Sequence, residues 1–219
     1  STASIYRFSC ELGYNGFPEL QKSIQHELQK ELKPMKELTN SIEDSSNEIN
    51  ILKNTIETNI SILKSLYNEE IYNNFTLVVD KIIKAQNLYI FALRSSFCAA
   101  YYFHFMLKQF MDNTHLLTLG HGDVYDNLKK LNENDVFFAI SFPPYARETI
   151  ELLEYARTKK SCTITVTDSK ASPLAFKADI SIIAKQSSKT YSFISVMTIL
   201  NAIVIAVGKK NKTRTIQIL

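Results

Sequence analysis

Beyond residue 75 the chain alternates short, nearly continuous apolar runs with longer amphipathic stretches, and this alternation constrains the possible folds strongly. A strand covered on both faces reads as a continuous apolar run, because none of its side chains faces water. Such runs separated by helical stretches predict a doubly wound α/β domain with five parallel strands between two helical layers. We expect strands at 88–91, 116–119, 136–140, 163–166 and 180–183, amphipathic stretches at 96–111 and 146–159, and a turn at 172–178.

The amino-terminal part has the pattern of two short helices. Ile5, Phe8 and Leu12 recur at helical spacing, and a glycine-rich break at 13–16 ends the run. A second apolar stripe then continues as far as Pro34, where the residue before the proline is pushed out of the helical region. We therefore expect a small helical unit before the α/β domain.

A connecting segment between these two parts is also helical in pattern. Its apolar side chains recur every three or four residues from Ile42 to Leu66, with Asn, Ser, Thr and Glu between them. This stripe fits pairing with the same segment of another subunit, and it fits packing on the chain's own domain equally well. The expected organisation is a helical unit at 1–37, a connecting segment at 38–74 and an α/β domain at 75–219.

The composition is that of a globular protein, with 45% hydrophobic and 21% charged residues. The longest apolar run, 196–207, is shorter than the roughly 20 residues that a membrane-spanning helix needs. The first residues show no initiator Met, basic segment or apolar core, so we expect neither a signal peptide nor an intact amino terminus. We expect a cytoplasmic protein with no membrane partner.

The cysteines argue against a metal or redox role. Cys10, Cys98 and Cys162 are odd in number, widely spaced and set among apolar residues. This pattern fits reduced, buried thiols better than disulfides or a zinc site. We therefore expect no metal and no cofactor.

Charge is distributed unevenly along the chain, whose net charge is +3. Segment 38–74 holds 2 Lys against 6 Asp and Glu, a net −4. Segment 75–219 holds 18 Lys and Arg against 11 Asp and Glu, a net +7. This basic excess attracts an anionic ligand as readily as DNA.

Ligands of doubly wound domains bind beyond the carboxyl ends of the strands, which directs attention to the loops after residues 91, 140 and 166. The first loop contains Arg94, Ser95 and Ser96 and leads directly into a helix. Hydroxyls and backbone amides at a helix amino end, with a guanidinium beside them, are suited to a phosphate. Because serine is also a common helix cap, we weigh two interpretations of this loop about evenly, a helix cap and an anion site.

The other two loops also lead into helices. Ser141 lies at the tip of the third strand, before two prolines that fix the turn, and Glu148 complements the helix amino end. A capped, proline-stiffened turn of this kind needs no ligand. Ser172 precedes Pro173, a natural first helical residue, and this order favours a cap.

These loops resemble those of sugar isomerase (SIS) domains, which bind phosphosugars through serine- and threonine-rich turns at the strand ends. The resemblance implies a flavodoxin-like strand order and a phosphosugar site. In that site Arg94, Ser95, Ser96 and Ser141 bind the phosphate, and Tyr145 and Ser172 line the pocket. The matching stretches are YIFALRSS at 89–96, DVFFAISFP at 135–143 with Glu148-Thr149, ITVTD at 164–168, and SPLA at 172–175 with Ala178-Asp179.

The amino-terminal stretches ASIYRF at 3–8 and LGYNGFPEL at 12–20 resemble the recognition helix and following turn of RpiR-type helix-turn-helix regulators. Such a helix places its first residues at base edges in the major groove, although Arg7 fits a phosphate contact or a surface pair nearly as well. The helices that precede the recognition helix in that family are missing from this sequence. The resemblance implies that Ser1, Thr2, Ser4, Tyr6 and Arg7 face DNA, while Ile5, Phe8 and Leu12 pack inward.

Two positions depart from the family pattern. Relatives often carry arginine and serine where Pro144 and Ala146 stand, so the pocket lacks two expected anion contacts. A phosphosugar isomerase is the enzyme alternative, with His121 as the one histidine at a strand tip, and a dimerisation scaffold without ligand is a third interpretation. We expect a carbohydrate-responsive transcriptional regulator without catalytic residues. Its expected partners are operator DNA, a sugar phosphate and further copies of itself, as a homodimer or higher homo-oligomer.

Overall fold

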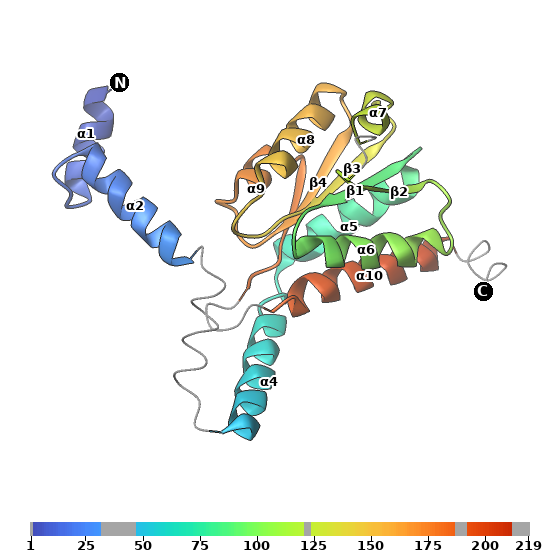
Figure 1. Ribbon diagram of the computed structural model, residues 1–219, viewed down its shortest axis with the longest axis horizontal. Helices are drawn as coiled ribbons and strands as arrows, with labels where there is room; N and C mark the ends of the chain where they lie inside the picture. Colours follow the sequence, from blue (N-terminus) through green and yellow to red (C-terminus); the bar gives the residue numbers. More distant parts are fainter. Residues whose placement is uncertain (1, 32–46, 121–123, 187–191, 212–219) are drawn as a thin grey trace.

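The computed structural model describes residues 2–31, 47–120, 124–186 and 192–211. A five-stranded, all-parallel sheet in the order β2-β1-β3-β4-β5 forms its centre (Figure 1). This arrangement confirms the predicted doubly wound fold and its flavodoxin-like strand order. The strands are β1 (Leu88–Ala92), β2 (Thr114–Leu117), β3 (Val136–Ile140), β4 (Cys162–Thr167) and β5 (Ile180–Ile183).

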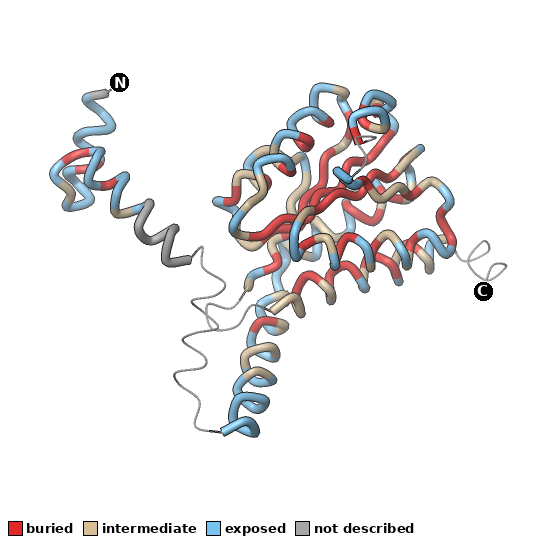
Figure 2. Tube along the Cα trace, in the orientation of Figure 1, coloured by how far each residue is buried: buried red, intermediate tan, exposed pale blue. Residues whose placement is uncertain are grey.

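Helices cover both faces of the sheet. Because successive strand side chains point to opposite faces, each strand packs against both layers of helices. In β1, Leu88 and Ile90 join a buried cluster with α5, α6 and α10, while Tyr89 and Phe91 join another with α7, α8 and α9. The strands are therefore buried from both sides, as the red core in Figure 2 shows. The helices are α5 (Glu69–Lys84), α6 (Ser96–Lys108), α7 (Val124–Lys129), α8 (Arg147–Thr158), α9 (Pro173–Lys177) and α10 (Ile194–Lys210).

Two helices precede this domain, α1 (Thr2–Glu11) and α2 (Phe17–Glu31), as the apolar spacing predicts. Gly13 and Gly16 in the turn between them have φ of +87° and +126°, conformations that favour glycine. The side chain of Tyr6 also lies so close to Gly16 that an added Cβ would meet it at 3.2 Å. The turn therefore needs glycine for both reasons at Gly16.

The prediction that Ile5, Phe8 and Leu12 pack inward is wrong for the described residues. These side chains are 47%, 55% and 52% exposed, whereas Ser9 and Leu20 are buried. Two helices that pack on each other enclose only the narrow strip between them, here around Ser9 and Leu20. The remaining apolar side chains of α1 consequently face outward.

The described part of the connecting segment contains one helix and the start of a second. α4 (Glu48–Lys64) ends before Ser65, and α5 begins after Asn68, whose side chain accepts hydrogen bonds from the first backbone amides of α5. Asn is a favoured N-cap residue, and this preference explains why a new helix starts after Asn68. The predicted domain limit at residue 75 falls within α5, and residues 38–46 lie outside the described part.

The cysteine environments differ from expectation. Cys10 and Cys98 are exposed, on the outward sides of α1 and α6, and Cys162 is half-buried at the start of β4. Burial raises the pKa of the Cys162 thiol, so this group stays neutral. No helix in the described part of the chain is long and apolar enough to cross a membrane.

Candidate functional site

The turn after β1 brings a cation beside the start of α6. Arg94 has φ of +56°, in the left-handed region that non-glycine residues rarely adopt, and its side chain is exposed. Ser95 follows with φ −63° and ψ −30°, which are helical angles, and makes no capping hydrogen bond. A capping side chain usually belongs to an extended residue, so the backbone of Ser95 explains why it does not cap. Ser96, the first residue of α6, is buried.

The loop after β3 forms the facing wall. Ser141 is buried at the strand tip, and its backbone N–H donates to the Val166 carbonyl at 3.2 Å. Pro143 and Pro144, joined by a cis peptide bond, carry the chain to Ala146, the residue before α8. Alanine has no side-chain acceptor, so α8 also begins without a side-chain cap.

These two loops enclose a cavity of about 320 Å³ at the carboxyl ends of β1 and β3. The starts of α6 and α8 both lie at it, and neither is capped by a side chain. The first amides of a helix lack partners within the helix, and its dipole adds partial positive charge. Two such ends beside an arginine form a place for an anion. Four of the six predicted ligand residues line the cavity, whose lining is Leu93, Arg94, Ser95, Ser96, Ser141, Phe142, Pro143, Pro144 and Ala146.

The other two predicted ligand residues, Tyr145 and Ser172, are not in this lining and have hydrogen-bond partners in the neighbouring loop. The Tyr145 hydroxyl donates to Asp168 Oδ1 at 2.7 Å. Burial, and then this hydrogen bond, raise the pKa of Tyr145 well above its ordinary value, so the phenol remains a donor. Ser172 Oγ accepts from the Leu174 amide at 3.2 Å and from the Thr167 hydroxyl at 3.0 Å. Ser172 therefore caps α9, as its position before Pro173 predicts.

Thr149 is a residue of interest that the prediction of site residues did not include. It lies in the first turn of α8, is fully buried, and its hydroxyl has no hydrogen-bond partner among the described residues. An unsatisfied buried hydroxyl is costly and needs an explanation. A partner supplied by a bound ligand is one explanation that the nearby cavity offers. The sequence carries a hint, since Thr149 belongs to the stretch that resembles SIS domains.

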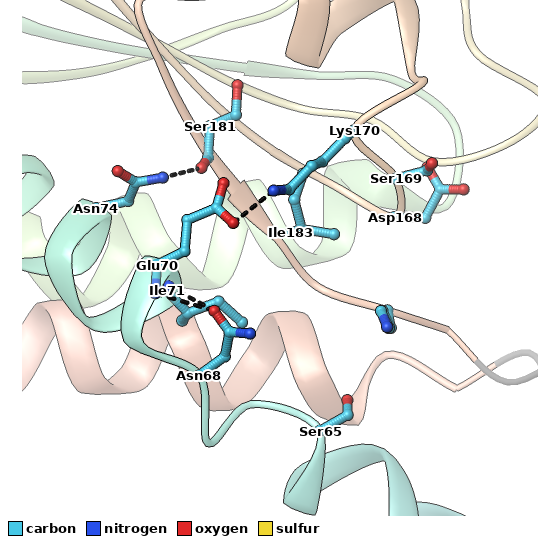
Figure 3. Close-up of a pocket in the computed structure, with 11 residues that line it drawn as sticks. Ser65, Asn68, Glu70, Ile71, Asn74, Asp168, Ser169, Lys170, Ser181 and Ile183 are labelled. Carbon is cyan, nitrogen blue, oxygen red and sulfur yellow. Dashed lines mark hydrogen bonds and ion pairs between the residues drawn. The ribbon is translucent and has the colours of Figure 1, made fainter.

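A second pocket, of about 360 Å³, lies at the carboxyl ends of β4 and β5 beside the start of α5 (Figure 3). Several of its polar groups are paired with one another, and Lys185 is a second cation in its lining. Lys170 forms an ion pair with Glu70, the Asn74 amide donates to the Ser181 carbonyl at 2.9 Å, and Asn68 caps α5. The helix amino end at this pocket, the start of α5, is therefore already capped by its own chain.

The described histidines do not line the first cavity. His115 stacks on Tyr89 with ring centroids 5.1 Å apart, and its Nε2 lies 3.2 Å from Asn87 Oδ1. Burial lowers the pKa of His115 and of His104, which keeps both rings neutral. His121, the candidate for isomerase chemistry, lies outside the described residues. Within the described ranges no cluster of three His, Cys, Asp or Glu side chains is arranged to hold a metal.

The residues predicted to face DNA lie on α1, apart from Ser1, which is outside the described residues. Thr2 begins the helix, and Ser4, Tyr6 and Arg7 are exposed on it. Tyr6 is 56% exposed although part of its ring lies against the turn at Gly16. The structure thus leaves Ser4, Tyr6 and Arg7 accessible to a partner.

A parallel sheet with helices on both faces and a ligand-sized cavity at a strand edge describes a class of ligand-binding α/β domains. A model of the SIS domain family matches residues 81–206, more than half of the chain. The chain therefore belongs to the SIS domain family.

Relatives support the likeness to regulators. The chain is 26% identical over 223 residues to an uncharacterized helix-turn-helix-type transcriptional regulator of Caldanaerobacter subterraneus, covering 96% of this chain and 75% of the relative. The match includes the amino-terminal helices as well as the SIS domain. The recognition of a SIS domain in a helix-turn-helix regulator is confirmed.

Solved structures share the fold at low sequence identity. The sugar isomerase domain of an RpiR transcription factor from Sphaerobacter thermophilus aligns with a TM-score of 0.69 and 20% identity, over 80% of this chain and 96% of that one. The NanR protein of Vibrio vulnificus, solved with ManNAc-6P, aligns with a TM-score of 0.66 and 13% identity, over 100% of this chain and 78% of that one. Other structures with this fold are described as putative phosphosugar isomerases, so the fold by itself does not separate a regulator from an enzyme.

Proposed function

We propose that this chain is a cytoplasmic, carbohydrate-responsive transcriptional regulator whose SIS domain binds a sugar phosphate in the cavity between α6 and α8. One observation carries the proposal. Two helix amino ends without side-chain caps meet Arg94 at a single cavity, and this combination suits a phosphate group. The coarser statement, a transcriptional regulator with a SIS domain, agrees with the regulator that the chain resembles.

In this proposal the phosphate receives hydrogen bonds from both helix ends. Ser95, Ser96 and the first amides of α6 bind it from one side, and Ser141 binds it from the tip of β3. Arg94 neutralises its charge from the exposed rim. Thr149 is not among the residues that line the cavity, and we assign its buried hydroxyl to the same site because that hydroxyl has no partner among the described residues.

Tyr145 and Ser172 act as supports in the proposal. The Tyr145 hydroxyl fixes Asp168, and Ser172 fixes the start of α9, so both hold the loops that border the sugar end of the ligand. The absence of a side chain at Pro144 and Ala146 that could bind an anion leaves the backbone amides of α8 as the main donors on that side. The structure of NanR with ManNAc-6P supports a sugar phosphate as the class of ligand.

In the proposal DNA binding belongs to the helical unit at 1–37, through Ser1 and through Thr2, Ser4, Tyr6 and Arg7 at the first turns of α1. The segment at 38–74 joins this unit to the ligand-binding domain at 75–219. A ligand changes DNA binding only if its affinity differs between two arrangements of the paired chains. We assign this difference in ligand affinity to the cavity, because the two loops that line it lead into α6 and α8, which extend across the domain.

The alternative function is a phosphosugar isomerase, which structures of the same fold favour. Aldose–ketose isomerisation needs an acid or base at the substrate carbonyl. Within the described lining of the cavity the one ionisable side chain is Arg94, and arginine is a poor general base. We therefore favour a sensor over an enzyme. A turnover assay with each sugar phosphate that binds separates the two functions.

A thermal-shift titration with a panel of sugar phosphates and the matching unphosphorylated sugars tests the proposal. A ligand that binds only the folded chain raises its melting temperature, by an amount that grows with concentration. We expect a rise with one or more sugar phosphates and no rise with their unphosphorylated partners. An unchanged melting temperature with every compound would instead favour a SIS scaffold that binds no ligand.

A further inference from the structure

The outward face of α4 is unusually apolar for a helix at the surface. Ile49, Leu52, Ile56 and Ile60 are 62%, 62%, 48% and 47% exposed, and Leu63 continues the row as a half-buried residue. At about 100° per residue these five side chains fall within an arc of roughly 80° on the helix. Most of α4 is exposed, as its mainly pale blue trace in Figure 2 shows. We call the row of these five side chains the α4 stripe.

The α4 stripe is distinct from the side by which α4 is attached to its own domain. Ile62 is the buried residue of α4, and Leu66, just beyond the helix, packs against the buried cluster beneath α5, α6 and α10. The Asn59 side chain accepts a hydrogen bond from Ser192 at 2.8 Å. The same wheel places these contacts roughly 60° to 120° away from Ile56. Packing on the chain's own domain therefore leaves four members of the α4 stripe exposed, Ile49, Leu52, Ile56 and Ile60.

The spacing of the α4 stripe is symmetric about Ile56. Ile49 and Leu63 lie equally far from it in sequence, and so do Leu52 and Ile60. If a second copy of α4 runs antiparallel with a two-fold axis at Ile56, every member of the stripe meets another member. Self-complementarity about a two-fold axis is the requirement for an isologous interface.

The charges of α4 fit the same arrangement. Lys53 and Glu57 lie on one flank of the stripe, one on each side of Ile56 in sequence. In an antiparallel pair with this two-fold axis, equal flanks meet, so each Lys53 lies near Glu57 of the second copy. The antiparallel helix dipoles also attract one another.

We propose that the α4 stripe is a dimerisation surface, on which α4 of a second copy of this chain packs antiparallel with Ile56 at the two-fold axis. The proposal does not depend on DNA binding or on a ligand in the cavity. Five apolar residues on each side are fewer than the 20 to 30 residues of a standard interface, so we expect a dimer that dissociates at about micromolar concentration.

Sedimentation velocity of the whole chain, over a range of about 1 to 200 μM, tests this surface. We expect a monomer–dimer equilibrium for the unaltered chain and a rise of at least about tenfold in the dissociation constant for Ile56→Gln and Leu52→Gln. Ile51→Gln is the matched control, because Ile51 is 43% exposed on the same helix but off the stripe. A chain that is monomeric at every concentration, or stripe variants that dimerise like the control, would overturn the proposal.

Disulfide cross-linking tests the orientation, in a background in which the exposed Cys10 and Cys98 are replaced by serine. Ile56→Cys should give a covalent dimer on mild oxidation, because the two copies of residue 56 meet at the axis. Ile49→Cys alone should not, whereas Ile49→Cys combined with Leu63→Cys should. Efficient cross-linking of Ile49→Cys by itself would show a parallel pair and contradict the proposed arrangement.

Discussion

Two pockets open at the same edge of the sheet, and their polar groups are satisfied in opposite ways. The cavity at β1 and β3 collects two helix ends that no side chain caps, together with Arg94. The pocket at β4 and β5 is of similar size, but Asn68 caps its one helix end and Lys170 pairs with Glu70 (Figure 3). The two pockets are thus similar in size and polarity. They differ in whether a side chain caps the helix amino ends beside them.

This difference teaches where an anion is expected to bind. A helix end capped by its own chain gains little from a ligand, because its amides already have an acceptor. An uncapped end beside a cation gains a charge-assisted hydrogen bond. The first cavity is therefore the phosphate site in our proposal, and the second pocket serves as its internal control.

The largest expected effect is on ligand binding, and it contrasts Arg94 at the cavity with the paired Lys170 at the second pocket. Arg94→Ala should weaken a bound sugar phosphate by about 1.5 to 3 kcal/mol, the scale of a hydrogen bond to a charged group. Lys170→Ala should change the affinity less than about twofold, because Lys170 is already paired with Glu70. Isothermal titration calorimetry of both variants measures this contrast. A folded Arg94→Ala variant with undiminished affinity would remove Arg94 from the site.

A smaller effect separates a capping serine from a serine at the cavity. Ser172→Ala should lower the free energy of unfolding by about 1 kcal/mol, because it removes the cap of α9. Ser95→Ala should lower it by less than about 0.5 kcal/mol, because the Ser95 side chain does not cap α6. Urea unfolding without ligand gives both values. Equal losses would mean that Ser95 has a stabilising role of the same weight as a cap.

Thr149→Val tests whether the buried hydroxyl is kept for a ligand. Because Thr149 Oγ1 is buried without a partner among the described residues, an isosteric apolar side chain should raise the free energy of unfolding of the unliganded chain, by about 0.5 to 1 kcal/mol. The same variant should bind a sugar phosphate more weakly. A clear loss of stability in urea unfolding would show that the hydroxyl is satisfied in solution.

The smallest effect is expected at the ion pair of the second pocket. The Lys170 and Glu70 side chains are 70% and 53% exposed, and such pairs contribute little to stability in water. Glu70→Gln should therefore change the free energy of unfolding by less than about 0.5 kcal/mol, and by still less in 1 M salt. Thermal unfolding at two ionic strengths checks this. A loss above 1 kcal/mol would show that the pocket is held together by the pair.

Much of the fold could be predicted because its strands are buried on both faces. The continuous apolar run of β3 fixes its bounds at 136–140 without error, since no polar residue interrupts it. The edge strand β2 was harder, because it pairs with one neighbour and contains Thr114 and His115. Its observed range, 114–117, begins two residues before the predicted one.

The site could be predicted less completely than the fold. Ser95 and Ser172 both precede helices, and the sequence does not reveal that Ser95 has helical backbone angles while Ser172 has an extended ψ of 138°. Only the extended residue can turn its hydroxyl onto the helix amides. The break between α4 and α5 was missed for a related reason, because Asn68 reads equally well as a polar residue within a helix and as a cap.

A ¹⁵N–¹H correlation spectrum titrated with a sugar phosphate tests the central claim most directly, because it reports on the helix ends themselves. We predict that the amide resonances of Ser96 in α6, and of Arg147 and Glu148 in α8, shift on titration. The next amides, those of Phe97 and Thr149, already donate to the Arg94 and Ala146 carbonyls. The amide of Glu70 in the capped start of α5 should remain in place. Shifts at Glu70 with none in α6 or α8 would place the anion at the other pocket and contradict the account.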